Sequence, residues 1–247
     1  MIRGLYAAAS AMVMEASRLD IIANNLANVN TPGFRRDIAL YRSFSDQLIM
    51  RRDAQQTPIG AIAMGAFLDA VFLTPDSGPL QRTGNALDVA LLGEAYLVVA
   101  TPAGQRYTRH GGLQLGRDGT LVTVSGDPVL GQAGPISVDG GQVEIRPDGA
   151  VWVDGVEGGR LLLVRFSDSS ALAKEGRNLL ASTAASGPSI PEPNGRVEPG
   201  FLELSNVDPV RELVAMITVM RAYEASKQAL RAQDEALQHG INTGALV

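Results

Sequence analysis

The stretch DPVRELVAMITVMRAYEASKQALRAQDEALQ, from Asp208 to Gln238, decides how the rest of the chain can fold. Asp208 and Pro209 form a helix start, because the carboxylate can accept a free backbone N–H and proline at the first helical position loses no hydrogen bond. Nothing interrupts the pattern before a stop signal at His239 and Gly240. We therefore predict one helix roughly 45 Å long, at about 1.5 Å per residue.

Apolar side chains recur every seven residues along this predicted helix, and a second row consists of alanines. The first row contains Met216, Tyr223, Leu230 and Leu237, with Leu213, Val219 and Met220 beside it; the second contains Ala222, Ala225, Ala229, Ala232 and Ala236. A seven-residue repeat is typical of a helix that packs on a partner helix. The small side chains would let the partner backbone come close.

The amino-terminal stretch shows the same repeat, in Leu5, Met12, Leu19 and Leu26. Arg3 and the apolar residues after it could also be a secretory signal peptide with an Ala-rich cleavage site. The repeat runs through that supposed site, which a signal peptide does not require. We therefore predict a mature helix from Ile2 to about Asn28.

An Asn-rich run ends this first helix, since Asn favours caps and turns and the residue before Pro32 is pushed out of the helical region. The run contains Asn24, Asn25, Asn28 and Asn30, followed by Thr31, Pro32 and Gly33. Two interpretations remain open. The amides are a frayed helix cap, or they are buried and fix the register of a packed helix.

The segment that follows predicts a short helix and then a long connector. Leu40, Tyr41, Phe44 and Leu48 could share one helical face within Asp37–Ile49. Arg51–Gly65 contains Pro58 and two glycines without a clear period, which indicates an extended connector. Such loops are uncommon inside one domain. We infer that the chain passes between two separate bodies.

From Ser77 to about Pro188 short β-like runs alternate with turn signals. The runs are Tyr96–Ala100, Arg106–Thr108, Leu121–Val124, Ile136–Val138, Val143–Ile145, Val151–Val153 and Leu161–Phe166, with Asp-Gly turns at 118, 139, 148 and 154. Tight turns without intervening helices predict an antiparallel sandwich or barrel. A Pro-rich linker, Ser186–Gly200, and a short strand, Phe201–Leu204, lead back to the last helix.

The predicted fold class is α+β, with long terminal helices that form an antiparallel, coiled-coil-like pair joined by extended connectors to a central antiparallel all-β domain. The predicted regions are 1–33 (first helix), 34–76 (connector with a possible short helix), 77–188 (all-β domain), 189–207 (return linker and short strand) and 208–247 (last helix). Two helices alone would leave apolar outer faces, which indicates further copies in a ring or helical tube.

Composition argues against an enzyme, a nucleic-acid binder and a membrane-inserted protein. The net charge of −5 gives no basic surface for nucleic acid, and no apolar run reaches the length of a membrane span. The chain lacks Cys, and its two His, at 110 and 239, have no second ligand at metal spacing. Nucleophile-elbow, P-loop and dinucleotide motifs are missing. We predict no catalytic residue, cofactor or metal.

Two terminal motifs resemble the signatures of bacterial flagellar rod and hook proteins. They are ANNLANVNTPGF (Ala23–Phe34) and LELSNVDPVRELVAMITVMRAYEASKQAL (Leu202–Leu230), and the stretch from Gly78 to Leu115 resembles the central β segment of that family. Length and the single β body resemble the rod proteins more than the hook subunit. The proximal-rod type is favoured, and the R-A-Y-E at Arg221–Glu224 keeps the distal-rod type as an alternative.

The resemblance implies a structural subunit of the basal-body rod that leaves the cell through the flagellar type III export apparatus without a cleaved signal. It would assemble outside the cytoplasm, in the periplasm, with other copies and neighbouring rod subunits, and transmit torque. By resemblance, Asn24, Asn25, Asn28, Thr31, Gly33 and Phe34 form the turn that leaves the helical core, and Asn206, Val207 and Asp208 set the re-entry.

The helical contact residues predicted for assembly are Leu5, Met12, Leu19, Leu26, Met216, Met220, Tyr223 and Leu230. Arg221 and Glu224 would pair across subunits, with a weak solvated ion pair as the simpler interpretation. An alternative function from another class is a secreted β-sandwich binding module that the terminal helices merely oligomerise.

Overall fold

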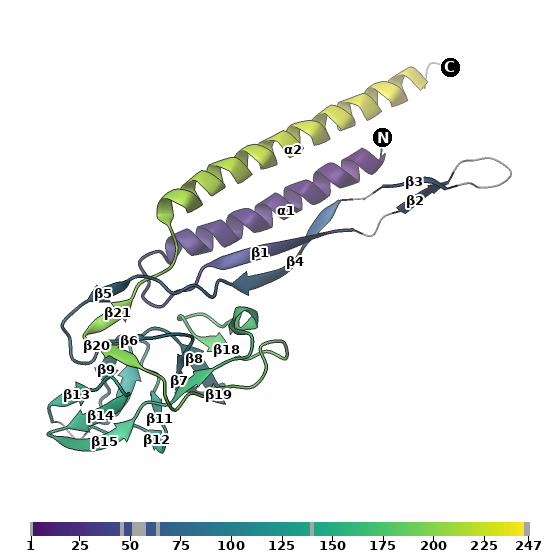
Figure 1. Ribbon diagram of the computed structural model, residues 1–247. Coiled ribbons are helices and arrows are strands. Elements are labelled where there is room, and N and C mark those ends of the chain that lie inside the picture. Colours follow the sequence, from purple (N-terminus) through teal and green to yellow (C-terminus); the bar gives the residue numbers. More distant parts are fainter. Residues whose placement is uncertain (1, 45–46, 51–57, 63–64, 139–140, 245–247) are drawn as a thin grey trace. The chain divides into compact units, whose positions relative to one another are not determined.

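The computed structural model describes residues 2–44, 47–50, 58–62, 65–138 and 141–244, and the chain divides into two units (Figure 1). The helical unit comprises residues 1–26, 37–71 and 209–247, and the β unit comprises residues 27–36 and 72–208. One long helix stands near each end of the chain, on either side of a central antiparallel β region. The predicted α+β class is confirmed.

Over its described residues, the helical unit contains two helices and two pairs of strands. Its elements are α1 (Ile2–Ala27), β1 (Asp37–Ser43), β2 (Gln47–Met50), β3 (Pro58–Ile62), β4 (Ala66–Leu73) and α2 (Pro209–Gly244). β2 pairs antiparallel with β3, and β1 pairs with β4. We call the second pair the β1–β4 ribbon.

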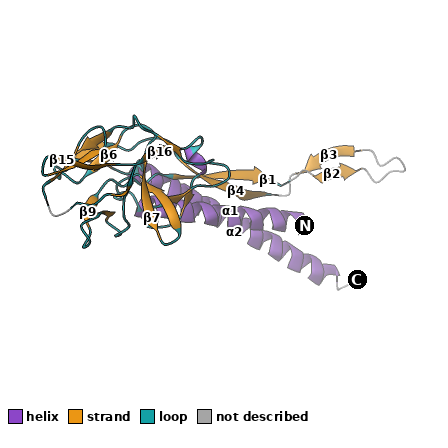
Figure 2. Ribbon diagram, turned by 90° about the horizontal axis from the view of Figure 1, so that it is seen from below, coloured by secondary structure: helices purple, strands orange, loops and turns teal. Residues whose placement is uncertain are grey.

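Within the helical unit, α1 lies between α2 and the β1–β4 ribbon (Figure 1). A Cβ added to Gly4 of α1 would lie 2.5 Å from Nε2 of Gln233 in α2. On the other side, Asn25 of α1 exchanges hydrogen bonds with the backbone of Asp37 in β1. α1 starts at the end of the unit where α2 stops, so the two helices are antiparallel (Figure 2).

One face of α2 is less exposed than the rest of the helix, and its residues are spaced alternately four and three apart. They are Glu212, Met216, Val219, Tyr223, Ser226, Leu230, Gln233 and Leu237. This spacing is that of a helix-packing seam. On α1, the predicted stripe residues Leu5, Met12, Leu19 and Leu26 are all half-buried. Coiled-coil packing of the two stripes stays a prediction.

The short helix predicted over 37–49 is wrong, because Asp37–Ser43 forms the strand β1. Burial alternates from residue to residue along this strand, so Leu40 is exposed while Tyr41 faces inward. Neighbouring apolar residues are compatible with a helical face, but Ile38 and Tyr41 also suit a pleated surface. Of the predicted connector Arg51–Gly65, residues 51–57 and 63–64 lie outside the described residues, and β3 occupies 58–62.

The predicted helix stop at His239 and Gly240 is also wrong, since α2 continues to Gly244. A glycine inside a helix costs about 1 kcal/mol relative to alanine, which weakens a helix without ending it. The Thr243 hydroxyl donates a hydrogen bond to the His239 carbonyl at 2.6 Å. This side-chain bond spans the glycine.

Where the structure describes it, the β unit consists of short strands and one 3-10 helical turn. Its elements are β5 (Leu80–Arg82), β6 (Val89–Leu91), β7 (Tyr96–Thr101), β8 (Gly104–Thr108), β9 (Leu113–Leu115), β10 (Leu121–Thr123), β11 (Leu130–Gly131), β12 (Gly134–Pro135), β13 (Val143–Ile145), β14 (Ala150–Val153), β15 (Val156–Arg160), β16 (Leu163–Arg165), η1 (Ser169–Ala171), β17 (Ala173–Lys174), β18 (Leu180–Ala181), β19 (Ile190–Pro191), β20 (Val197–Pro199) and β21 (Phe201–Glu203). The pairings between them are antiparallel.

The largest sheet has the order β17-β18-β8-β7-β16-β19, and β13-β14-β15 form a second sheet. β7 lies in the middle, where Leu97 and Val99 face one buried apolar cluster while Tyr96 and Val98 face another. Two-sided burial explains why β7 is a continuous apolar run. The β unit therefore encloses apolar side chains on both faces of its central strand.

Most predicted β runs are confirmed, with two differences. Ile136–Val138 forms no named strand, although Ser137 makes an isolated bridge to Thr120. The Pro-rich stretch interpreted as a return linker carries β19 and β20, which pair with β16 and β6. Pro191 and Pro199 occupy strand positions in β19 and β20, where prolines are restricted to edges and strand ends.

Candidate functional site

Three buried charged side chains meet in the β unit. Glu203 of β21 accepts a hydrogen bond on Oε2 from Arg109 Nε at 2.8 Å, and the same oxygen forms an ion pair with Arg109 Nη2 at 2.6 Å. Its Oε1 lies 3.3 Å from Nη2 of Arg35. All three residues are at most 4% exposed. Two guanidinium groups thus share one carboxylate away from water, a geometry in which losing one partner is costly.

Arg109 uses its remaining donors on backbone carbonyls of the segment from β6 to β7. Nη1 donates to Gly93 at 3.0 Å and to Ala95 at 2.6 Å, and Nη2 donates to Leu91 at 2.9 Å. Buried polar groups are stable when their hydrogen-bonding capacity is used in this way. Arg109 therefore connects β21 to the edge of the core.

Arg35 binds the chain just before β5. Its Nη1 donates to the carbonyls of Pro75 and Asp76, and its Nη2 lies 3.3 Å from the Ser77 hydroxyl. Burial, reinforced by the nearby positive charge of Arg109, lowers the pKa of Arg35, and Glu203 opposes this shift. The carboxylate thus offsets the repulsion between the two guanidinium groups.

Two independent features require glycine at position 33. Its φ of +70° lies in the left-handed region, and an added Cβ would lie 2.5 Å from the carbonyl carbon of Arg109. Its N–H donates to the Glu203 carbonyl at 2.7 Å. The adjacent Phe34 ring is buried, with the Lys174 ammonium 3.7 Å from its centroid.

Asn206 joins the outgoing and returning chain segments. Its Oδ1 accepts from the Arg36 N–H at 2.8 Å, and its Nδ2 donates to the Asp76 carbonyl at 2.8 Å. Val207, next to it, is buried, whereas Asp208 is exposed. We call residues 31–36, Arg109, Glu203 and Asn206 the β-unit junction.

The other predicted Asn residues are used differently. Asn25 is 1% exposed and bonds both ways with Asp37, donating from Nδ2 at 3.0 Å and accepting on Oδ1 at 2.9 Å. The sequence left two interpretations open, and the Asn25 side chain fits the buried amide rather than the frayed helix cap. Asn24 is exposed, and Asn28 accepts from the Thr31 hydroxyl at 3.2 Å.

Ten of the predicted site residues fall into three groups by where they lie in the structure. Thr31, Gly33, Phe34 and Asn206 come together at the β-unit junction, and Met216, Tyr223 and Leu230 lie on the covered face of α2. Met220, Arg221 and Glu224 are exposed on α2. Their predicted role in subunit contacts stays a prediction.

Sequence reasoning missed Arg35, Arg109 and Glu203. The usable signal was a charged residue in or directly after a short β run, as in YTR at 107–109 and LEL at 202–204, where a covered strand face would bury it.

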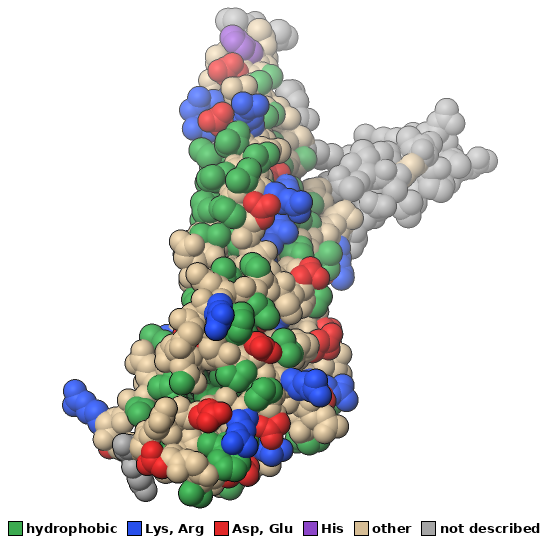
Figure 3. All heavy atoms as spheres, turned by 60° about the vertical axis from the view of Figure 1, so that its left-hand side comes forward, with side chains coloured by type: hydrophobic (Ala, Val, Ile, Leu, Met, Phe, Trp, Pro, Cys, Tyr) green, Lys and Arg blue, Asp and Glu red, His purple; other side chains and the backbone are tan. Residues whose placement is uncertain are grey.

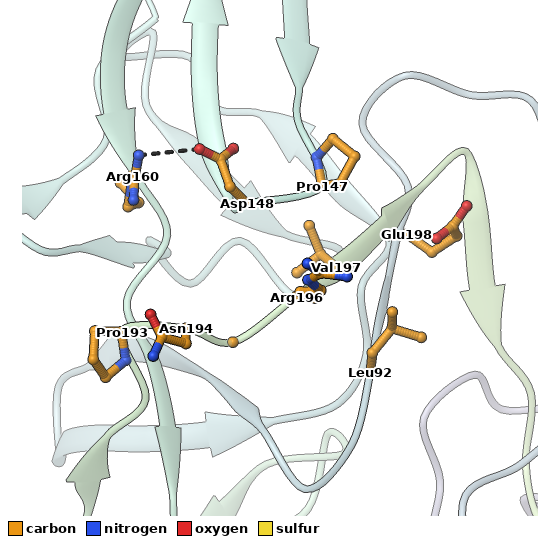
Figure 4. Close-up of a pocket in the computed structure, with 10 residues that line it drawn as sticks. Leu92, Pro147, Asp148, Arg160, Pro193, Asn194, Arg196, Val197 and Glu198 are labelled. Atoms are coloured by element: carbon orange, nitrogen blue, oxygen red, sulfur yellow. Dashed lines mark hydrogen bonds and ion pairs between the residues drawn. The ribbon is translucent and has the colours of Figure 1, made fainter.

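A surface hollow of about 610 Å³ lies on the β unit (Figure 4). Pro147 and Asp148 line one side, the segment from Pro193 to Glu198 lines the other, and Asp148 is paired with Arg160 at 3.1 Å. Of the charged residues that line it, Asp148 and Arg196 are exposed, and Arg160 and Glu198 are partly buried. Within the described residues no group of three His, Asp or Glu side chains could hold a metal ion.

The buried charged and polar groups of this site hold backbone segments of the β unit together, which is a structural role. Over their described residues, neither α1 nor α2 combines the length and apolar character that a membrane crossing needs.

Three family models match consecutive parts of the chain. "Flagella basal body rod protein" matches residues 5–35, "Flagellar hook protein FlgE/F/G D1 domain" matches 90–153, and "Flagellar basal body rod FlgEFG protein C-terminal" matches 198–243. They cover α1, much of the β unit and α2.

Full-length relatives agree with these models. The FlgG rod protein of Bacillus subtilis is 34% identical over 98% of this chain and 99% of its own length. The FlgF rod protein of Caulobacter vibrioides is 35% identical over 90% of this chain and 89% of its own length, and FlgG of Agrobacterium fabrum is 35% identical over 94% and 96%. The chain belongs to the flagellar basal-body rod protein family, a family of structural proteins of the flagellar basal body rather than of enzymes.

Relatives of both kinds, FlgF and FlgG, match with almost the same identity. The preference for the proximal-rod type therefore stays a prediction.

Proposed function

We propose that this chain is a structural subunit of the flagellar rod, and that its terminal helices pack with those of other copies and of neighbouring rod subunits. In the assembled rod it would form part of the axial shaft that transmits torque. The flagellar type III export apparatus would deliver it to the periplasmic side, where the rod forms.

The observation that carries this proposal is the surface of α2. Five large apolar side chains in its first three turns are between 47% and 67% exposed, and they are Val210, Leu213, Val214, Ile217 and Met220. Figure 3 shows hydrophobic side chains along the helical part of the chain, with charged side chains scattered between them. An exposed apolar face of this kind marks a contact surface.

The β-unit junction supports the same function in a different way. A shaft that transmits torque needs a defined path for the chain between its helical part and its β part. At the β-unit end of that path, the junction holds the outgoing and the returning chain segments together through Gly33, Glu203 and Asn206.

The test is deletion of the gene in its own host, followed by complementation. Cells without the chain should not swim, and the unaltered gene should restore swimming. Met216→Asp, on the covered face of α2, should fail to restore it, while Val156→Asp, at an exposed position of the β unit, should succeed. Normal swimming of the deletion strain would overturn the proposal.

The surface hollow of the β unit favours the second candidate, a secreted binding module that its helices oligomerise. That function predicts a closed small oligomer of the purified protein in negative stain. The rod function predicts tubes or open stacks instead.

A further inference from the structure

The β1–β4 ribbon has one apolar face that is open to solvent. Burial alternates along both strands, and the outward side chains are the apolar Ile38, Leu40, Phe44, Phe67 and Val71, each between 38% and 46% exposed, together with Arg42 and Asp69. The rings of Phe44 and Phe67 lie 5.1 Å apart, and Arg42 pairs with Asp69 at 2.7 Å on the same ribbon. Its charges are thus already paired, and its apolar residues are not covered.

A two-stranded ribbon in water is marginal unless its faces are packed. The inward face of this ribbon is packed on α1, since Asn25 binds Asp37 and a Cβ on Gly65 would collide with the Ser10 side chain. The outward face has no equivalent helix among the described residues of the chain.

The helix that would fit this face has the pattern of the exposed stripe on α2. Val210, Leu213, Val214, Ile217 and Met220 follow the i, i+3, i+4, i+7 spacing of one helical face. At 3.6 residues per turn this stripe is centred roughly 130° around the helix from the covered face at Glu212, Met216 and Val219. The stripe therefore points away from the partner that covers α2.

The two open faces cannot cover each other within one chain. α1 lies between α2 and the β1–β4 ribbon (Figure 1). The helical unit is thus a stack of three layers with an apolar helix stripe on one outer side and an apolar ribbon on the other.

We propose that the exposed stripe of α2 in one copy docks on the outward face of the β1–β4 ribbon of a second copy. The ribbon would then be enclosed between two helices, repeating on its outer face the packing that α1 makes on its inner face. Because unlike surfaces meet, the contact is heterologous and continues from copy to copy instead of closing as a pair. This inference rests on the proposed rod function and names the surface that the subunits use.

The chain contains no cysteine, so single cysteines report this contact without background from native thiols. Ile217→Cys on α2 and Leu40→Cys on β1 are prepared as separate full-length variants, and circular dichroism first verifies that each keeps the helical content of the wild type. Oxidation of a mixture of the two should give a disulfide-linked dimer that either variant alone lacks. The double variant Ile217→Cys with Leu40→Cys should give a ladder of higher multimers.

Val156→Cys replaces Leu40→Cys as the matched control, because Val156 is an exposed strand residue of the β unit. Its mixture with Ile217→Cys should give no dimer. A second pair, Leu213→Cys with Phe67→Cys, provides the same readout if either first variant fails to fold.

Two results would overturn the inference. Cross-linking of Leu40→Cys to itself, or of Ile217→Cys to itself, would show that like faces meet. Rods that assemble and rotate while neither mixed pair cross-links would rule out the contact yet leave the rod function intact. Failure of the rod function has a separate signature, which is normal swimming of the deletion strain.

Discussion

The β unit and the helical unit differ in how far their apolar side chains are exposed to solvent. In the β unit, a continuous cluster around Leu97, Val99 and Leu121 is closed to water, and buried charges find partners in the same unit. In α2, Val219 is the buried apolar residue, while side chains such as Ile217 and Val214 remain open. The β unit is therefore complete as a single chain, and the helical unit has surfaces that other chains would complete.

This difference has a direct physical consequence for stability. Burial of apolar area contributes about 25 cal/mol per Å², so a unit with few fully buried residues gains little from folding alone. The β unit should be stable at any concentration, whereas the helical unit should depend on association.

The strongest test is to compare the unfolding of the two units in urea. Trp152 lies in β14 and is the one Trp of the chain, so its fluorescence reports the β unit, while far-UV circular dichroism is dominated by the helices. We expect the circular dichroism signal to be lost at lower urea, with a midpoint that rises with protein concentration. Coincident transitions that do not depend on concentration would contradict the comparison.

The second test removes the shared carboxylate of the β-unit junction. Glu203→Gln leaves Arg35 and Arg109 buried without their counter-charge, which should cost about 3–5 kcal/mol of the free energy of unfolding. Trp152 fluorescence in urea measures the loss. Glu192→Gln, which removes the charge from a partly exposed pair with Arg165 at 2.9 Å, is the matched control and should cost about 1 kcal/mol or less. Equal effects of both variants would show that burial does not matter here.

A third test changes Gly33 to Ala. The left-handed φ and the collision with the Arg109 backbone should together cost about 1–3 kcal/mol in the same assay. Gly159→Ala is the control, because its Cβ would meet Ile136 at an ordinary 3.6 Å. The idea fails if Gly33→Ala is as stable as Gly159→Ala.

The smallest expected effect is a change in the stability of the β unit with pH. Burial lowers the pKa of His110 below its ordinary value of 6.5, and its Nδ1 accepts a hydrogen bond from the Gly112 N–H at 3.1 Å. The unfolded chain therefore binds this proton more readily than the folded chain. Stability should be unaffected above about pH 6.5 and should fall below it, with a slope of at most about 1.4 kcal/mol per pH unit.

His110→Gln should flatten that part of the pH profile of the β unit, measured by Trp152 fluorescence. His239→Gln is the control, since His239 is exposed on α2, and it should leave the profile unchanged. An identical profile for wild type and His110→Gln would remove His110 as the cause.

The helices and most strands could be predicted because their signals are local. Seven-residue repeats and Asp-Gly turns depend on neighbours a few residues apart. β1 was missed for the same reason, because Leu40 and Tyr41 are adjacent and suit a helix face or two faces of a strand. Only the tertiary context, with α1 against one face, decides between them.

The β-unit junction could be predicted only in part. Gly33, Phe34 and Asn206 were singled out by resemblance, yet their partners were not. Arg109 and Glu203 are 94 residues apart, and Asn206 is 170 residues from Arg36. A single sequence contains no signal that joins such distant positions, so the shared carboxylate emerges only from the fold.

The separation of 170 residues between Arg36 and Asn206 also determines when the β-unit junction can form as the chain is made. A polypeptide that emerges amino end first presents α1 and Arg35 long before Glu203 and Asn206 appear. Until residue 203 has emerged, the two guanidinium groups lack their carboxylate, and the bond between Arg36 and Asn206 forms only after residue 206 has emerged. The β-unit junction therefore forms only after nearly all of the β unit has been made.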